Sequence, residues 1–225
     1  MKCSRLSNIE YLFFDLDGTL TDPYEGITKA VAHALEKFGI HIEDRNELKC
    51  FIGPPLNECF MEKYNMSEPD SFIAVDYFRE YFTVKGIYEN ELFPEIPKML
   101  QAFIDNGYKL VIATSKPTVF AEKILDRFDL KRYFISVYGS ELNGERVRKS
   151  DVIKYALKEL KINDTDGVLM IGDREHDIIG AHQANIRSVG VRWGYGSFEE
   201  LNNAGADFIC KTAEELERLL VTDEH

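Results

Sequence analysis

Acidic side chains follow two of the short apolar runs of this chain, and their spacing favours cation chemistry. The first run is followed by DLDGTLTD, residues 15–22, and a later run by GDREHD, residues 172–177. Asp15 and Asp17 are two residues apart at a predicted strand end, so their side chains point the same way and repel unless a cation relieves them. With Asp173 from another strand end, three oxygens would form a hard-cation site suited to Mg²⁺. A lone D-x-D-G could instead form only an Asx-type turn, but the second acidic cluster favours the metal site.

Three further residues stand where they could act at the same point. Thr114 follows another apolar run and could donate a hydrogen bond to a phosphoryl oxygen, or it could satisfy a nearby backbone group. Lys149 precedes a predicted helix and could neutralise the same oxygens, or it could lie in solvent. Asp177 could support the metal site from behind, or it could cap the helix near whose start it lies.

Composition and charge exclude several classes of protein. The 225 residues carry 27 Lys and Arg against 39 Asp and Glu, a net charge of −12 at pH 7 that would repel nucleic acids and anionic lipids. No apolar run approaches the roughly 18 residues that a membrane span needs, and the N-terminus does not have the pattern of a signal peptide. The 4 cysteines form no CxxC pair, which predicts reduced thiols in a cytoplasmic protein.

The elements that must position these residues are short apolar runs that alternate with amphipathic stretches. Because most runs are continuously apolar, they predict strands buried on both faces of a parallel sheet. The predicted strands are Tyr11–Phe14, Leu110–Ala113, Phe134–Tyr138, Val168–Ile171, Ser188–Val191 and Asp207–Cys210. Lys116–Phe128 and Ser150–Leu160 have helical periodicity, so we expect an α/β fold with a doubly wound, Rossmann-like, mostly parallel sheet. Ligands bind such sheets at the carboxyl ends of the strands, where the polar residues above stand.

The segment 23–89 interrupts this alternation because its apolar residues recur at helical spacing only. A loop of that length without structure of its own would be improbable in a compact domain. We therefore predict a small α-helical domain at residues 23–89, inserted into an α/β core made of residues 1–22 and 90–225.

The ordered motifs closely resemble those of the haloacid dehalogenase superfamily over nearly the whole chain. They are DLDGTLTD, a strand ending in TS, a lysine and GDREHD, and the helical insertion resembles the mobile cap domain of that family. The stretches KPTVFAEKIL and LFPEI, with the overall length, look most similar to phosphoglycolate phosphatase-like members. The resemblance implies a Mg²⁺-dependent phosphatase that hydrolyses small phosphorylated metabolites through an aspartyl-phosphate.

The resemblance also implies a role for each candidate residue. Asp15 would be the nucleophile, and Asp17 would be the general acid and then the general base. Mg²⁺ would be held by the carboxylates of Asp15 and Asp173 and by the backbone carbonyl of Asp17, while Thr114 and Lys149 would stabilise charge. The cap would close over the substrate, and the segment 51–56 would either read the leaving group or merely connect two helices.

Several alternatives stay open at this stage. Within the superfamily they are a 5′-nucleotidase, a pyrophosphatase and a sugar phosphomutase, which would keep the same motifs. From another class, a non-catalytic metal-binding module could retain the fold. The physiological substrate and the oligomeric state are not predicted from the sequence.

Overall fold

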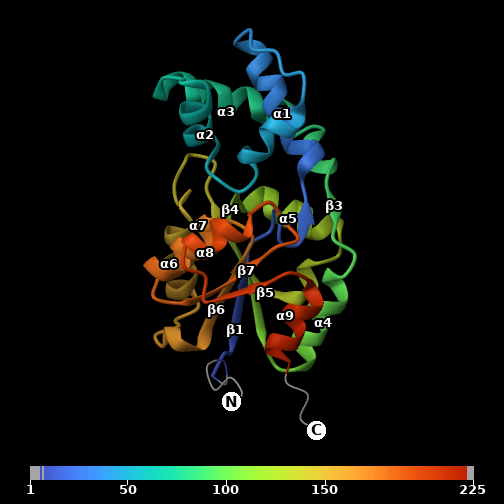
Figure 1. Ribbon diagram of the computed structural model, residues 1–225, viewed down its shortest axis with the longest axis vertical. Coiled ribbons are helices and arrows are strands. Elements are labelled where there is room, and N and C mark those ends of the chain that lie inside the picture. Colours follow the sequence, from blue (N-terminus) through green and yellow to red (C-terminus); the bar gives the residue numbers. More distant parts are fainter. Residues whose placement is uncertain (1–5, 7, 222–225) are drawn as a thin grey trace. The chain divides into compact units, whose positions relative to one another are not determined.

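The computed structural model describes residue 6 and residues 8–221, and the chain divides into two compact units (Figure 1). The first unit, called the core unit here, consists of Met1–Leu20 and Leu92–His225. The second, called the helical unit, consists of Thr21–Glu91. No helix in the described ranges combines the length and the apolar composition that crossing a membrane requires.

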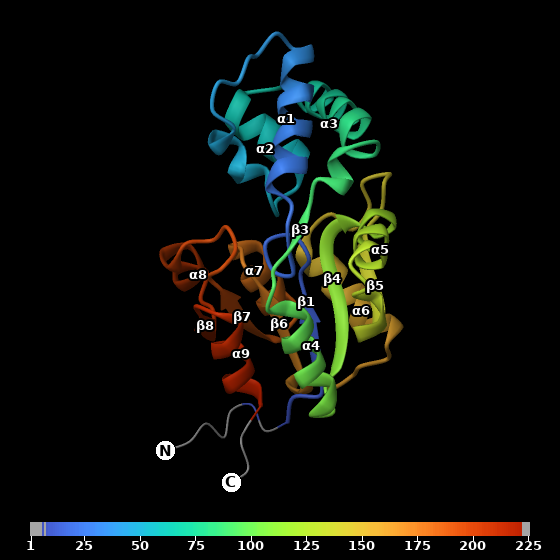
Figure 2. The same cartoon turned by 90° about the vertical axis from the view of Figure 1, so that its right-hand side faces the viewer.

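The core unit is built on a 6-stranded sheet in which every neighbouring pair of strands is parallel. Its strand order is β5-β4-β1-β6-β7-β8, so β1 is central and the chain passes to either side of it (Figure 2). The strands are β1 (Tyr11–Phe14), β4 (Lys109–Pro117), β5 (Phe134–Ser140), β6 (Val168–Gly172), β7 (Arg187–Val191) and β8 (Phe208–Cys210). The predicted doubly wound α/β fold is therefore confirmed, and the carboxyl end of β1 lies where the strand order reverses.

Helices cover both faces of the sheet because the strand side chains alternate between them. Phe13 belongs to an apolar cluster with α6 and α7, whereas Phe14 contacts Phe103 of α4 on the other face, with ring centroids 6.2 Å apart. In Figures 1 and 2, α9 lies beside α4. The helices of the core unit are α4 (Ile96–Asp105), α5 (Thr118–Arg127), α6 (Lys149–Glu159), α7 (Glu175–Gln183), α8 (Phe198–Asn203) and α9 (Ala213–Leu220).

One predicted helix boundary is wrong, and the correction moves a lysine. The sequence pattern predicts a helix that begins at Lys116, but β4 continues through Pro117 and α5 begins at Thr118. The residue before a proline is disfavoured in the helical region and takes an extended backbone, which is the conformation of a strand. Lys116 therefore lies at the carboxyl end of β4 instead of in the first turn of a helix.

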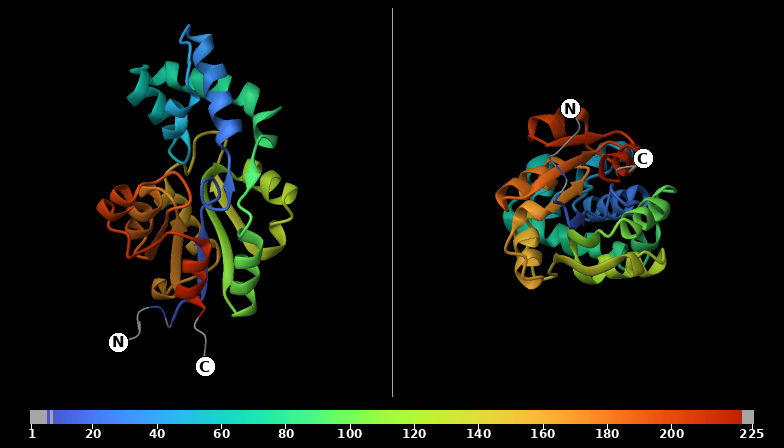
Figure 3. Two further views of the ribbon diagram at one scale, coloured as in Figure 1. Left: turned by 45° about the vertical axis from the view of Figure 1, so that its right-hand side comes forward. Right: turned by 90° about the horizontal axis from the view of Figure 1, so that it is seen from below.

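The helical unit consists of α-helices and short 3₁₀ segments, and Figure 3 shows these blue-to-teal helices packed on one another. Its elements are α1 (Tyr24–Lys37), η1 (Arg45–Phe51), α2 (Leu56–Tyr64), α3 (Glu68–Phe82) and η2 (Gly86–Tyr88). Ser67 caps α3 by accepting a hydrogen bond from the backbone N–H of Asp70, and proline stands in the first turn. Two short strands, β2 (Thr21–Asp22) and β3 (Glu91–Leu92), form a separate sheet that is too short to show a periodic signal in the sequence.

Two of the six residues in segment 51–56, which was expected either to read the leaving group or to connect two helices, are buried inside the helical unit. The side chains of Phe51 and Ile52 are buried, and the Phe51 ring packs against the Phe60 ring at 4.8 Å. These two side chains therefore stabilise the helical unit, and only residues 53–56 of the segment are partly exposed.

Candidate active site

The candidate residues come from four places along the chain and meet at the carboxyl ends of β1, β4 and β6. Asp15 and Asp17 follow β1, Thr114 lies near the end of β4, and Lys149 is the first residue of α6. All are buried, as are Asp173 after β6 and Asp177 in the first turn of α7. Parallel strands bring these positions together because their carboxyl ends share one edge of the sheet.

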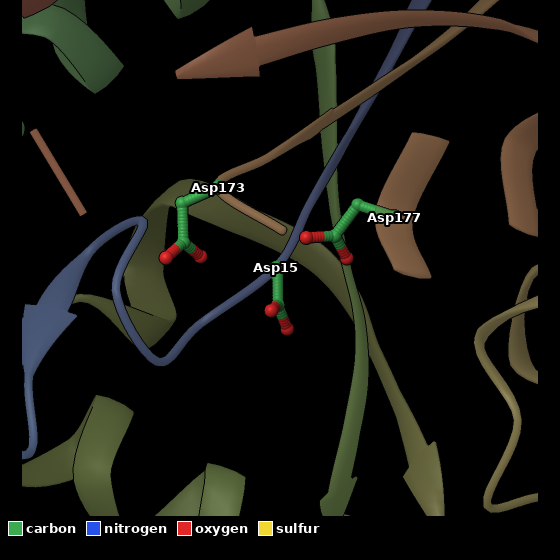
Figure 4. A group of neighbouring side chains, drawn as sticks. All are labelled: Asp15, Asp173 and Asp177. Atoms are coloured by element: carbon green, nitrogen blue, oxygen red, sulfur yellow. The ribbon is translucent and has the colours of Figure 1, made fainter. Parts of the chain in front are cut away.

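Three of the carboxylates form a group that could hold a cation (Figure 4). Asp15, Asp173 and Asp177 each present an oxygen, and these oxygens lie within 4.8 Å of one another. Figure 4 shows Asp15 lying between Asp173 and Asp177. The Asp17 carboxylate lies outside this group, and its Oδ2 is 2.6 Å from the Nζ of Lys116.

Lys149 is buried between two of the acids instead of lying in solvent. Its Nζ is 2.8 Å from Oδ1 of Asp15 and 2.7 Å from Oδ1 of Asp177, and it donates a hydrogen bond of 3.1 Å to the carbonyl of Ala113. Burial alone would lower the pKa of Lys149, but the two carboxylates outweigh it and raise the pKa. The ammonium group is therefore held charged between the two acids.

Asp177 caps α7 and also lies among the acids of the site. Its Oδ2 accepts a hydrogen bond of 3.1 Å from the backbone N–H of Arg174 and so caps α7. Its Oδ1 meets Lys149, and the carboxylate belongs to the acidic group around Asp15. The hydrogen bond that caps α7 therefore also holds the Asp177 carboxylate in place.

The site holds more negative than positive charge. With all four acids ionised, the carboxylates of the three grouped acids and of Asp17 would exceed the two ammonium groups of Lys116 and Lys149 by two charges. Burial, followed by the charges of Asp177 and Asp15, raises the pKa of Asp173 well above its usual value of 3.8. A divalent cation would remove both the excess charge and the mutual repulsion. The donors are all oxygens, which hard divalent cations prefer, so the residues present fit such an ion.

Asp173 is oriented by residues that the sequence reasoning missed. Thr19 Oγ1 donates a hydrogen bond of 3.2 Å to Asp173 Oδ1, and the backbone N–H of Tyr195 donates one of 2.8 Å to Oδ2. The indole Nε1 of Trp193 in turn donates to the carbonyl of Thr19 at 2.9 Å. No motif marks these partners, although Thr19 stands inside the first motif and residues 193–196 read WGYG after a predicted strand.

Gly18 allows the turn after β1 to approach Asp173 closely. Its φ is +82°, in the left-handed region, and a Cβ atom at this position would lie 2.3 Å from Asp173 Oδ2. Only glycine meets both conditions. The local sequence of the first motif therefore serves the packing of two acidic loops as well as the placement of Asp15 and Asp17.

Thr114 makes the local hydrogen bond to a nearby backbone group that was one of its two expected roles. Its Oγ1 accepts a hydrogen bond of 3.2 Å from the backbone N–H of Lys116, which holds the end of β4. The hydroxyl hydrogen stays available for donation because the oxygen here acts as an acceptor. Thr114 is buried beside the same strand end from which Lys116 reaches Asp17.

The comparisons with known proteins agree with this geometry. The family described as "Haloacid dehalogenase-like hydrolase" matches residues 12–191. A 5′-nucleotidase of Pseudomonas aeruginosa is 44% identical over 214 residues, which are 93% of this chain and 94% of that protein. A phosphoglycolate phosphatase of Vibrio parahaemolyticus is 24% identical over 93% of this chain and 95% of its own length.

A solved structure agrees in fold as well as in sequence. The crystal structure of a predicted phosphatase from Clostridium acetobutylicum superposes with a TM-score of 0.92 and 50% sequence identity, covering 94% of this chain and 98% of that one. The family match covers more than half of the chain. The matched residues include Asp15, Asp173 and Asp177, the acids of the site described above. The chain belongs to the haloacid dehalogenase-like hydrolase family and is one of its phosphatases.

Proposed function

We propose that this phosphatase hydrolyses small phosphomonoesters with Mg²⁺, through a phosphoryl group carried transiently on Asp15. The observation that carries the proposal is the buried Asp15 carboxylate, which lies 2.8 Å from Lys149 and within 4.8 Å of two further acids. A carboxylate in this setting is held in one orientation at a point where positive charge can be concentrated. Such an arrangement suits attack on a phosphate group.

Asp15 would act as the nucleophile. A carboxylate oxygen attacks phosphorus in line with the leaving oxygen, the P–O bond to the leaving group breaks, and an aspartyl-phosphate forms. Asp17 gives a proton to the departing alkoxide and then accepts one from the water that hydrolyses the intermediate. Burial raises the pKa of Asp17 above that of a free aspartate although Lys116 opposes the shift, and a raised pKa favours the proton-carrying role.

Charge balance is the task of the surrounding groups. Asp15, Asp173 and the backbone carbonyl of Asp17 would hold Mg²⁺, which supplies the positive charge that lets a carboxylate approach a phosphate dianion. Lys149 neutralises Asp15 and the transferring phosphoryl oxygens, and the Thr114 hydroxyl donates a hydrogen bond to one of those oxygens. Asp177 keeps Lys149 in place through its 2.7 Å ion pair.

Nucleoside 5′-monophosphates are the first substrates to test. The support is the 44% identity to the Pseudomonas aeruginosa 5′-nucleotidase over nearly the full length of both proteins. Phosphoglycolate comes second, supported by the motif stretches and by the 24% identical Vibrio relative. We assign the choice of leaving group to the helical unit, which is the part of the chain that resembles the cap domains of the family.

The test is a panel of phosphate esters assayed with Mg²⁺ and with EDTA, using the wild type and Asp15→Asn. The panel holds nucleoside 5′-monophosphates, phosphoglycolate, sugar phosphates and pyrophosphate. We expect Mg²⁺-dependent release of phosphate from a monoester and a loss of more than about 10³-fold in Asp15→Asn. Asp151→Asn, an exposed acid on α6, is the matched control and should keep full activity.

Two outcomes would contradict the proposal. Wild-type turnover by Asp15→Asn would exclude Asp15 as the nucleophile. Absence of Mg²⁺-dependent turnover for every compound would favour a metal-binding module without catalysis. Conversion of one sugar phosphate into an isomer without phosphate release would identify a phosphomutase, in which the carried phosphoryl group returns to a sugar.

A further inference from the structure

The ion pair between Lys116 and Asp17 is a contact that the function proposed above does not explain. The Nζ of Lys116 lies 2.6 Å from Asp17 Oδ2, and the two side chains are only 7% and 9% exposed. Removing two charged groups from water is costly, so a buried pair is weak evidence for a purely stabilising role. We therefore look for a functional role of this ion pair at the site that contains Asp17.

The two oxygens of Asp17 differ sharply in their surroundings. Oδ2 meets the ammonium of Lys116, whereas Oδ1 is buried and has no hydrogen-bond partner among the described residues. A buried oxygen without a partner is unfavourable by about 1–3 kcal/mol. Such atoms are rare in folded proteins, and a catalytic role is one of the few explanations for them. The unpartnered Oδ1 is thus the atom of Asp17 that can meet a substrate.

The end of β4 holds the backbone of Lys116 in place. It is the residue before the last of β4, its backbone N–H donates 3.2 Å to Thr114 Oγ1, and Pro117 fixes the backbone that follows. The other buried ammonium of the site, that of Lys149, lies between Asp15 and Asp177. The site therefore pairs one lysine with the proposed nucleophile and the other with the proposed acid.

We propose that Lys116 is a positioning residue for proton transfer: it holds Oδ2 of Asp17 so that Oδ1 is the oxygen that exchanges the proton with the leaving group. This inference rests on the proposed function, in which Asp17 is the general acid and base. When the bond between phosphorus and the leaving oxygen breaks, its electron pair stays on that oxygen. The proton on Oδ1 of Asp17 moves to the leaving oxygen, and the Asp17 carboxylate that remains faces Lys116.

This role predicts a dependence on the leaving group that a structural role would not produce. An alkoxide needs a proton to depart, whereas p-nitrophenolate departs without one. Lys116→Met should therefore slow the first displacement of an alkyl phosphate by about 10²-fold, the usual size of a general-acid effect. The first displacement of p-nitrophenyl phosphate should change by less than about threefold, and KM should stay the same for both compounds.

The experiment is single-turnover rapid quench on the full-length protein with Mg²⁺, following the phosphorylated enzyme. The variants are Lys116→Met, Asp17→Asn and the double variant. Because Lys116 acts through Asp17, we expect the double variant to be no slower than Asp17→Asn within about twofold. Lys131→Met, which removes an exposed lysine paired with Glu122, is the matched control and should leave both rates unchanged.

Three results would overturn the inference: equal slowing of both esters, a raised KM with multiplicative losses in the double variant, or unchanged rates in Lys116→Met. The second would show that Lys116 binds the phosphoryl group directly. If Lys116→Met does not fold, as judged by circular dichroism, Lys116→Gln takes its place in the same cycle. An active Asp15→Asn would defeat the proposed function, whereas an inactive Asp15→Asn with multiplicative losses would defeat only the role of Lys116.

Discussion

The backbone N–H of Tyr195 donates a 2.8 Å hydrogen bond to Oδ2 of Asp173, joining the loop after β7 to the acid that follows β6. The contact is close because Gly194 allows it: a Cβ atom there would lie 2.4 Å from the same oxygen. The loop after β7 therefore belongs to the site, although it contributes no acidic group to it.

Gly194→Ala should weaken Mg²⁺ binding by about 10–100-fold, since groups that orient a metal ligand contribute on that scale. The added methyl group must displace Asp173 or the loop. Isothermal titration with Mg²⁺ measures the affinity directly. Gly167→Ala is the control, because its Cβ would meet only the carbonyl oxygen of Asn8 at 3.3 Å, away from the acidic group. Equal affinities for the Gly194 variant and the wild type would contradict the role of the loop.

Stabilisation of the protein by Mg²⁺ should increase with pH. The pKa of Asp173 is raised well above 3.8, first by burial and then by Asp177 and Asp15. A carboxyl group whose pKa is raised in the folded state stabilises the metal-free protein at pH values below the pKa that the group has in the unfolded chain. This contribution is lost as the pH rises through the pKa that the group has in the folded protein. Protons therefore compete with Mg²⁺ in that window and stop competing above it.

Thermal unfolding with Mg²⁺ and with EDTA, from about pH 5 to about pH 8, measures this effect as the difference in Tm. We expect the difference to grow with pH in the wild type and to be small throughout in Asp173→Asn. A difference in Tm that is independent of pH would contradict metal binding by this carboxylate.

Lys149→Met should lower the free energy of unfolding by about 3–5 kcal/mol in EDTA, the usual effect of removing one partner from a buried ion pair. The variant leaves Asp15 and Asp177 facing each other without a cation. Mg²⁺ should restore part of this loss because it supplies positive charge to the same acids. Urea unfolding with and without Mg²⁺ measures both effects, and Lys154→Met, an exposed lysine on α6, should change neither. A loss below about 1 kcal/mol would contradict the buried ion pairs.

The thiol of Cys210 should resist alkylation while that of Cys50 reacts. Burial, with a smaller effect of Glu215, raises the pKa of Cys210 to about 11, whereas Cys50 is exposed. At pH 8 only about one Cys210 in 10³ is a thiolate, the reactive form. Peptide mapping after iodoacetamide treatment compares the two sites, and denatured protein, in which both should react, is the control. Comparable rates in the folded protein would contradict the burial of Cys210.

The sequence by itself determined which segments form the strands of a parallel sheet. β1 and β6 agree with their predicted runs to within one residue, because strands buried on both faces must be apolar throughout. The same reasoning placed Asp15, Asp17 and Asp173 at strand ends, where a parallel sheet brings them to one edge. These features depend on local patterns and on a general rule of topology, so one chain suffices to predict them.

Only the tertiary structure decided how charge is shared within the site. Whether Lys149 lies in solvent or between acids depends on packing between α6 and α7, elements whose contact no local pattern encodes. Pro117 keeps the backbone of Lys116 extended, so Lys116 lies in the strand and its ammonium group contacts Asp17. The indole of Trp193 donates a hydrogen bond to the carbonyl of Thr19 in the first motif, 174 residues away in the sequence. Hydrogen bonds and ion pairs form between groups that are close in space, so their partners follow from the folded chain and not from spacing along it.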